Sequence, residues 1–133
     1  LDIKEKVYNS LLPHLKATAI LSSNTSGIPL ADLTASLPDD LKKRFMITHF
    51  FNPPRYMQLL ELVRGELTTD DTYNTMIKFG ESVLGKGIVH AKDTPNFIGN
   101  RIGVYGMMTT MNFAIQQLLF WCRKEAMLMH YVH

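Results

Sequence analysis

The sequence is poor in cysteine and carries no large excess of charge of either sign. Cys122 is the only cysteine among 133 residues, which excludes a disulfide framework and any zinc site built from several cysteines. Fourteen Lys and Arg against twelve Asp and Glu give a net charge of +2, which excludes a nucleic-acid-binding tail and an acidic disordered segment. The five histidines show no spacing typical of a metal site, so we predict none. The hydrophobic content of 46% is ordinary and suffices for one globular core.

Two further absences concern the start of the chain and its longest uncharged stretch. The sequence begins with Leu1 rather than Met, has no capping residue before its first helical pattern, and shows no signal peptide, so we expect a piece of a longer protein. Residues 102–122 carry no charge and have the length of a membrane span. They also contain several side chains that are costly in lipid, among them Asn112, Gln116 and Gln117. We therefore expect a buried or interfacial helix and no membrane span.

Helix and strand patterns alternate along the chain. The spacing of apolar residues predicts helices over 1–15, over 28–37, from Thr69 to Gly85 or Gly87, and from Phe97 to the end. Short apolar runs predict strands over 18–22, 45–48, 59–63 and 87–91. This alternation indicates an α/β sheet that is parallel at least in its early strands. In the third helix, the predicted inner face consists of Tyr73, Met76, Ile77, Val83 and Leu84. The last helix, which is rich in Met, is compatible with core packing or with a dimer interface.

Two polar residues follow the ends of predicted strands. Ligands bind outside the carboxyl ends of strands in open α/β sheets, and Ser26 and His49 both lie at such ends. If the two strands are neighbours, both residues face one crevice. A serine in this kind of turn is also a common helix cap, and a histidine at a strand end is also often structural. Both interpretations stay open at this point.

A carboxylate inside an apolar strand and a polar pair at a helix start add to these candidates. Glu61 lies within Leu59–Val63, where an unpaired carboxylate is costly unless it points to solvent at an edge. If the chain turns back after the two prolines that follow His49, Glu61 comes beside the imidazole and orients it as a general base. Asn100 lies in the first turn of the last helix, where it either caps the helix or helps to bind a developing negative charge.

Four segments in this order resemble the 3-hydroxyacyl-CoA dehydrogenase family. They are residues 19–26 (AILSSNTS), 49–54 (HFFNPP), 60–63 (LELV) and 92–101 (KDTPNFIGNR). The sequence from Asn52 to Tyr56 (NPPRY) is similar to that of the large members of the family, which carry a fused hydratase. The resemblance implies hydride transfer between C3 of an L-3-hydroxyacyl-CoA and NAD in fatty-acid β-oxidation, with the 3-ketoacyl-CoA as product.

The resemblance also implies roles for individual residues. His49 takes the hydroxyl proton, and Glu61 pairs with it and stabilises its charge. Ser26 and Asn100 hydrogen-bond the substrate oxygen, and Ser26 lies near the nicotinamide. Lys4 and Asn52 match positions that contact NAD in relatives. The expected compartment is the bacterial cytoplasm, with the mitochondrial matrix or the peroxisome as alternatives.

One departure from the family pattern limits what the chain is expected to do. The Gly-rich turn and the acidic residue that bind the first part of NAD do not occur among the 133 residues. The resemblance therefore implies a partial Rossmann-like sheet over 1–95, the second half of an NAD-binding domain, followed over 96–133 by the start of a helical, dimerising domain. We expect weak NAD binding, little turnover, and a homo-oligomer built through the last helix. Two alternatives stay open: a related hydroxy-acid or 3-hydroxybutyryl-CoA dehydrogenase, and a non-catalytic, self-assembling piece.

Overall fold

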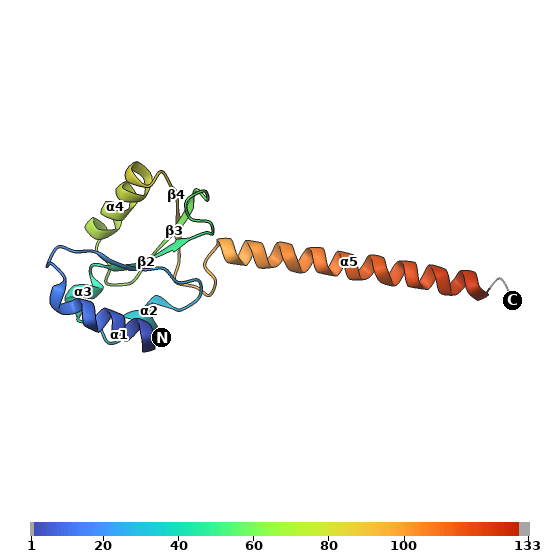
Figure 1. Cartoon of the computed structure of the whole chain (residues 1–133), viewed down its shortest axis with the longest axis horizontal. Helices are drawn as coiled ribbons and strands as arrows, with labels where there is room; N and C mark the ends of the chain where they lie inside the picture. The colour runs from blue at the N-terminus through green and yellow to red at the C-terminus, as the bar shows by residue number, and fades with distance from the viewer. Residues whose placement is uncertain (1, 131–133) are drawn as a thin grey trace. The chain divides into compact units, whose positions relative to one another are not determined.

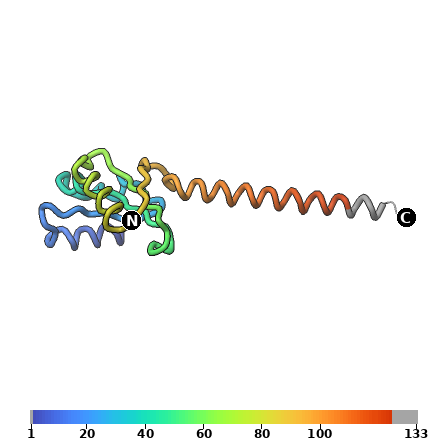
Figure 2. Tube along the Cα trace, turned by 90° about the horizontal axis from the view of Figure 1, so that it is seen from above, coloured from blue at the N-terminus to red at the C-terminus, as the bar shows by residue number. Residues whose placement is uncertain are grey.

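The computed structural model describes the secondary structure of residues 2–130 and the side chains up to residue 124. The chain divides into two compact units, with the boundary between Ile98 and Gly99. The elements of the first unit are α1 (Asp2–Leu11), η1 (Leu12–His14), β1 (Leu21–Ser23), α2 (Leu30–Thr34), α3 (Asp39–Lys42), β2 (Phe45–Phe50), β3 (Leu59–Arg64), α4 (Asp70–Lys78), η2 (Phe79–Val83) and β4 (Gly87–Ala91). The second unit contains α5 (Gly99–His130), and the coloured part of this helix is continuous in Figure 2.

The four strands form one sheet in the order β1-β2-β3-β4. β1 pairs parallel to β2, and β3 pairs parallel to β4, but β2 and β3 are antiparallel. The expected α/β class is confirmed, and the first pair of strands is parallel as predicted. β2 ends before Pro53 and Pro54, which cannot continue a ladder, and the chain has reversed direction by the start of β3.

Each face of the sheet is covered by helices (Figure 1). Side chains alternate along a strand, so Phe45 and Ile47 of β2 point to one face and Met46 to the other. The core on the first face joins residues of α1, α2 and α3 to the sheet, and the core on the second face joins Tyr73 of α4. His49 lies two residues after Ile47 and therefore points to the first face. Glu61 is directly opposite His49 in the ladder, so its side chain lies on the same face.

The N-terminal elements differ from the predicted ranges. The first helix ends at Leu11 and continues only as a 3₁₀ turn, because Pro13 has no N–H to donate. The first strand begins at Leu21 rather than residue 18, since the preceding residues form a turn in which the Ala19 amide bonds the Lys16 carbonyl. The predicted helix over 28–37 covers only Leu30–Thr34, and the short helix α3 that follows Pro38 was not predicted.

The third helix and the last helix also differ from the prediction. Thr69 caps α4 as predicted, with its hydroxyl accepting the Thr72 amide. The α-helix ends at Lys78 and continues as a π-helical turn, η2, which changes the direction of the side chains that follow. Val83 is therefore 69% exposed and Leu84 38% exposed, and their predicted place on the inner face is wrong. The last helix starts at Gly99 rather than at residue 97.

Along the part of α5 whose side chains are described, up to residue 124, apolar side chains lie on all sides. Twelve large apolar residues of this part are exposed: Ile102, Val104, Tyr105, Met107, Met108, Met111, Phe113, Ile115, Leu118, Leu119, Phe120 and Trp121. A helix that is apolar all round normally needs a partner surface, which fits the expectation of an interface. Within residues 2–130, no helix is long and apolar enough to cross a membrane.

A buried tyrosine on the second face gives a testable prediction. The Tyr73 hydroxyl lies 2.8 Å from His90 Nδ1, and burial raises the pKa of the phenol above its ordinary value of 10.0, an effect that Arg64 partly opposes. The unfolded chain therefore ionises first as pH rises, so folding stability conferred by Tyr73 is lost above pH 10. Tyr73→Phe should cost about 1 kcal/mol at pH 8 and should lose less stability than the wild type between pH 8 and pH ~11.

Urea unfolding at both pH values measures this difference. Tyr56→Phe is the matched control, because Tyr56 is 75% exposed and should behave as the wild type at both pH values. Equal loss of stability in wild type and Tyr73→Phe would contradict the prediction.

Candidate functional site

The structure brings His49 and Glu61 together as cross-strand partners. They are directly opposite in the antiparallel β2–β3 ladder, and His49 Nδ1 lies 2.7 Å from Glu61 Oε2. The His49 side chain is 4% exposed and the Glu61 side chain 1% exposed, which excludes the solvent-facing alternative for Glu61. Since a carboxylate only accepts, Nδ1 carries the proton and the lone pair of the neutral ring is on Nε2. This is the arrangement of an oriented general base.

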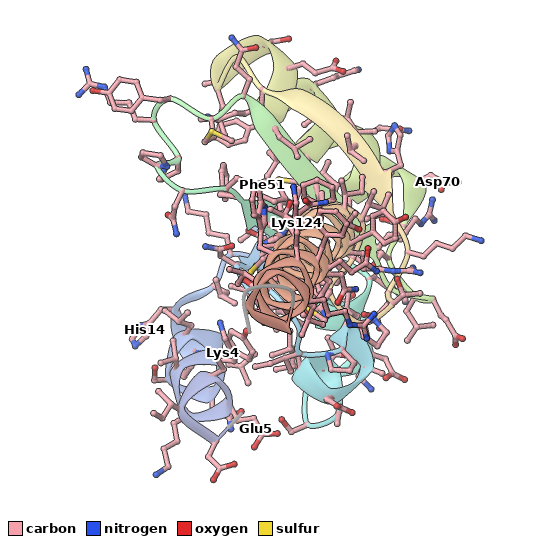
Figure 3. All side chains as sticks on the ribbon, turned by 90° about the vertical axis from the view of Figure 1, so that its right-hand side faces the viewer. Lys4, Glu5, His14, Phe51, Asp70 and Lys124 are labelled. Carbon is pink, nitrogen blue, oxygen red and sulfur yellow. The ribbon has the colours of Figure 1, made fainter. Side chains whose placement is uncertain are left out.

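Two aromatic rings and one backbone amide also contact this pair. The rings of Phe51 (labelled in Figure 3) and Phe97 lie 4.6 Å and 5.5 Å from the imidazole centroid. Glu61 Oε1 accepts a hydrogen bond of 2.9 Å from the Ile98 amide. A buried carboxylate needs such donors, because its desolvation is otherwise costly. Sequence reasoning missed Phe97 and Ile98, although both lie within the segment 92–101.

The loop that carries Ser26 follows β1 at the same edge of the sheet. β1 and β2 are neighbouring parallel strands, so their carboxyl ends lie side by side. The loop is tied down at both ends: Asn24 Oδ1 accepts the Phe50 amide at 3.4 Å, and Thr25 Oγ1 accepts the Ile28 amide at 3.3 Å. Ser26 itself is exposed. It is not the N-cap of α2, because that position is Pro29.

Lys4 reaches the end of β1 from α1 (Lys4 is labelled in Figure 3). Its ammonium donates to Ser23 Oγ at 3.1 Å and to the Asn24 carbonyl at 3.2 Å. Ser23 is buried and also lies 2.8 Å from the Tyr8 hydroxyl. Tyr8 and Ser23 were missed by sequence reasoning, although Tyr8 lies four residues after Lys4 on the same helix face. The contacts fix the Lys4 ammonium beside the loop of Ser26.

The remaining two candidates are Asn52 and Asn100. Asn52 lies in the loop just after β2, is exposed, and precedes Pro53 through a cis peptide bond. Asn100 belongs to the second unit, where it is the second residue of α5 and half-buried. Its expected role with the other site residues remains a prediction.

A pocket of about 440 Å³ lies elsewhere, at the end of the sheet where β2 begins. It is lined by residues such as Leu30, Lys42 and Arg64, and it includes none of the predicted site residues. Its two cations are already paired, Lys42 with Asp39 at 3.0 Å and Arg64 with Asp70 at 2.8 Å. The His49–Glu61 pair therefore defines the candidate site better than this pocket does. Among the described residues, no group of three or more His, Cys, Asp or Glu side chains lies close enough to hold a metal ion.

Solved structures place this fold among dehydrogenases. The chain is similar to FadB2 of M. tuberculosis, with a TM-score of 0.78, 28% identity, and coverage of 88% of this chain and 41% of that one. It is also similar to (S)-3-hydroxybutyryl-CoA dehydrogenase from Ralstonia eutropha, with a TM-score of 0.70, 35% identity, and coverage of 77% and 35%. The class defined by fold and site is a Rossmann-like, dinucleotide-binding α/β domain followed by a long helix, as expected.

The family follows from the sequence comparisons. The sequence model described as "3-hydroxyacyl-CoA dehydrogenase, NAD binding domain" matches residues 1–94. The chain therefore belongs to the 3-hydroxyacyl-CoA dehydrogenase family, a family of oxidoreductases. This confirms the resemblance of the four segments, and it confirms NAD as the cofactor of the matched domain.

Curated relatives are much longer than this chain. A probable 3-hydroxyacyl-CoA dehydrogenase from Bacillus subtilis is 50% identical over 111 residues, which are 84% of this chain and 14% of the relative. A putative fatty acid oxidation complex trifunctional enzyme from Rickettsia felis is 47% identical over 119 residues, 90% of this chain and 16% of the relative. The chain thus spans about a seventh of the length of these relatives.

Proposed function

We propose that this chain supplies the catalytic pair of an NAD-dependent L-3-hydroxyacyl-CoA dehydrogenase of fatty-acid β-oxidation. The observation that carries the proposal is the buried His49–Glu61 pair, with 2.7 Å between Nδ1 and Oε2. The pair lies at the sheet edge to which Lys4 and the loop of Ser26 also lead. One oriented base beside hydrogen-bond donors is what oxidation of a secondary alcohol to a ketone requires.

We propose one role for each of the side chains that the family resemblance singled out. Bound NAD supplies the acceptor for the hydride that leaves C3 of the substrate. His49 takes the proton of the C3 hydroxyl on Nε2, because Nδ1 faces Glu61, and it returns that proton in the reverse reaction. Glu61 keeps the ring oriented and stabilises the imidazolium. Ser26 and Asn100 hydrogen-bond the C3 oxygen as it becomes a carbonyl.

The polar side chains near the end of β1 suit hydrogen bonds to the ribose or phosphate groups of NAD. The Lys4 ammonium is fixed by Ser23 and Asn24, so it is a preorganised donor for a ribose hydroxyl or a phosphate oxygen. Ser26 and Asn52 add a hydroxyl and an amide in the loops after β1 and β2. None of these groups is the Gly-rich turn that holds the pyrophosphate, and that turn does not occur among the 133 residues. The proposed binding of NAD therefore needs residues beyond these.

The test compares the chain alone with a chimaera. The purified 133-residue chain should oxidise NADH with acetoacetyl-CoA slowly or not at all, because it lacks the pyrophosphate site. A chimaera in which the aligned 84% of this chain replaces the 111 matching residues of the Bacillus subtilis relative should be active. A folded chimaera without activity, beside an active parent, would refute the proposal. An ordinary enzyme rate of the chain alone would refute the expected inactivity.

A second substrate class is favoured by two similar proteins. A 3-hydroxybutyryl-CoA dehydrogenase from Bradyrhizobium diazoefficiens is 38% identical over 117 residues. The similar structure from Ralstonia eutropha is also a 3-hydroxybutyryl-CoA dehydrogenase. A short-chain preference is therefore the alternative. A series of 3-ketoacyl-CoA substrates of increasing chain length, measured on the chimaera, separates the two: kcat/KM falls with chain length for the alternative only.

The expected homo-oligomer and compartment remain predictions. The exposed apolar residues of α5 support an interface, and light scattering of the purified chain tests it. A non-catalytic, self-assembling piece would form the oligomer and yet give a chimaera with no affinity for NADH. The bacterial cytoplasm stays the expected compartment.

A further inference from the structure

The segment between β4 and α5 has an unusual backbone. Asn96 has a φ of 63° and Phe97 a φ of 48°, so two successive residues with a Cβ adopt the left-handed region. Asn tolerates this region, but it is an outlier for a bulky residue such as Phe. Conformations of this kind persist only where the surrounding structure imposes them, and they concentrate at functional sites.

The turn places two groups against the buried pair. Phe97 is 1% exposed, and its ring lies 5.5 Å from the imidazole of His49 with an interplanar angle of 57°. The next residue, Ile98, donates its amide to Glu61 Oε1 at 2.9 Å, although its side chain is 39% exposed. The contact with Glu61 is thus made by the backbone, and it depends on the direction that the two left-handed residues give to the chain.

These contacts restrict both members of the pair. With Oε2 on His49 Nδ1 and Oε1 on the Ile98 amide, rotation of the Glu61 carboxylate would break a buried hydrogen bond. The imidazole is held by Phe97 and by Phe51, whose ring lies 4.6 Å away. A general base is effective only when its lone pair is held at one place.

We infer that Asn96–Ile98 is a positioning element for the His49–Glu61 pair: the Phe97 ring fixes the imidazole, and the Ile98 amide fixes the carboxylate. The inference rests on the proposed function, because positioning matters for catalysis only if His49 acts as the base. Its test, however, does not measure activity. A purely structural turn would connect β4 to α5 and contribute to the core without controlling the tautomer of His49.

The test uses NMR spectroscopy of the 15N-labelled 133-residue chain. Two quantities are measured: the hydrogen-exchange rate of the Ile98 amide and the 15N shifts of the His49 ring nitrogens, which report the tautomer. In the wild type, His49 should be the Nδ1–H tautomer and the Ile98 amide should be protected. Phe97→Leu keeps an apolar residue but removes the ring, and it should raise the Ile98 exchange rate at least ~10-fold and mix the tautomers. Asn96→Gly keeps the left-handed turn and should preserve both signals.

Several outcomes would overturn the inference. The first is a folded Phe97→Leu variant with wild-type Ile98 exchange and a wild-type tautomer. The second needs no variant: an Ile98 amide that exchanges at the rate of exposed chain in the wild type. If Phe97→Leu unfolds, Glu61→Leu provides the second perturbation, because it removes the acceptor of the Ile98 amide; unchanged Ile98 exchange in that variant also overturns the inference. Because no readout involves NADH, an inactive chimaera refutes the proposed function and leaves these measurements unaffected.

Discussion

Replacing His49 with Gln is expected to lower kcat of the chimaera by a factor of about 10² to 10⁴, the usual contribution of a positioned general base. Gln fills a similar space and can still hydrogen-bond Glu61, but it cannot take a proton. A water molecule cannot readily take over the role of the base, because position 49 is buried, with His49 3% exposed. KM for NADH should change little, because the ring acts at the substrate. Steady-state rates with acetoacetyl-CoA and NADH measure both parameters.

A second histidine in the same chain provides the control. His14 (labelled in Figure 3) lies in η1 and is exposed. His14→Gln makes the same chemical change outside the site and should leave kcat within a factor of about two. A His49→Gln chimaera with kcat equal to that of the His14→Gln chimaera would show that His49 is not the base.

The His49–Glu61 pair could be predicted because its signals are local and strong. A carboxylate inside the apolar run Leu59–Val63 needs a partner unless it points to solvent, and the prolines after His49 end the preceding strand. The prediction that Glu61 comes beside His49 depends on the chain turning back after these prolines, and the antiparallel register of β2 and β3 shows that it does. The parallel pairing of β1 and β2 follows in the same way from the alternation of helices and strands.

Other features could not be predicted because they oppose local preference. Nothing in the sequence indicates a left-handed backbone at Phe97, whose intrinsic preference is against it. The π-helical turn η2 moves Val83 away from the face that helical spacing assigns to it, and such turns have no clear sequence signal. The left-handed turn precedes Ile98, whose amide donates to Glu61 Oε1, so this deviation lies beside the candidate site.

Removing the Glu61 carboxylate should strongly lower the free energy of unfolding of the first unit. Glu61→Ala leaves the Ile98 amide and His49 Nδ1 buried without the Glu61 carboxylate as acceptor. It also leaves a cavity where the side chain was, because Glu61 is 0% exposed. Loss of one partner of a buried pair costs about 3–5 kcal/mol. Glu61→Gln keeps the volume and one acceptor oxygen, so it should cost less, about 1–3 kcal/mol.

Urea unfolding of the 133-residue chain at neutral pH measures both variants. Glu66→Ala is the matched control, because Glu66 is exposed just beyond β3 and its loss should change stability by less than about 0.5 kcal/mol. The order of stability then distinguishes two explanations of the buried carboxylate. If Glu61 is retained for the site alone, an apolar replacement of similar size such as Glu61→Leu restores stability relative to Glu61→Ala while the chimaera loses activity. If Glu61→Ala is as stable as Glu66→Ala, the two hydrogen bonds do not hold the carboxylate, and the positioning of His49 must have another origin.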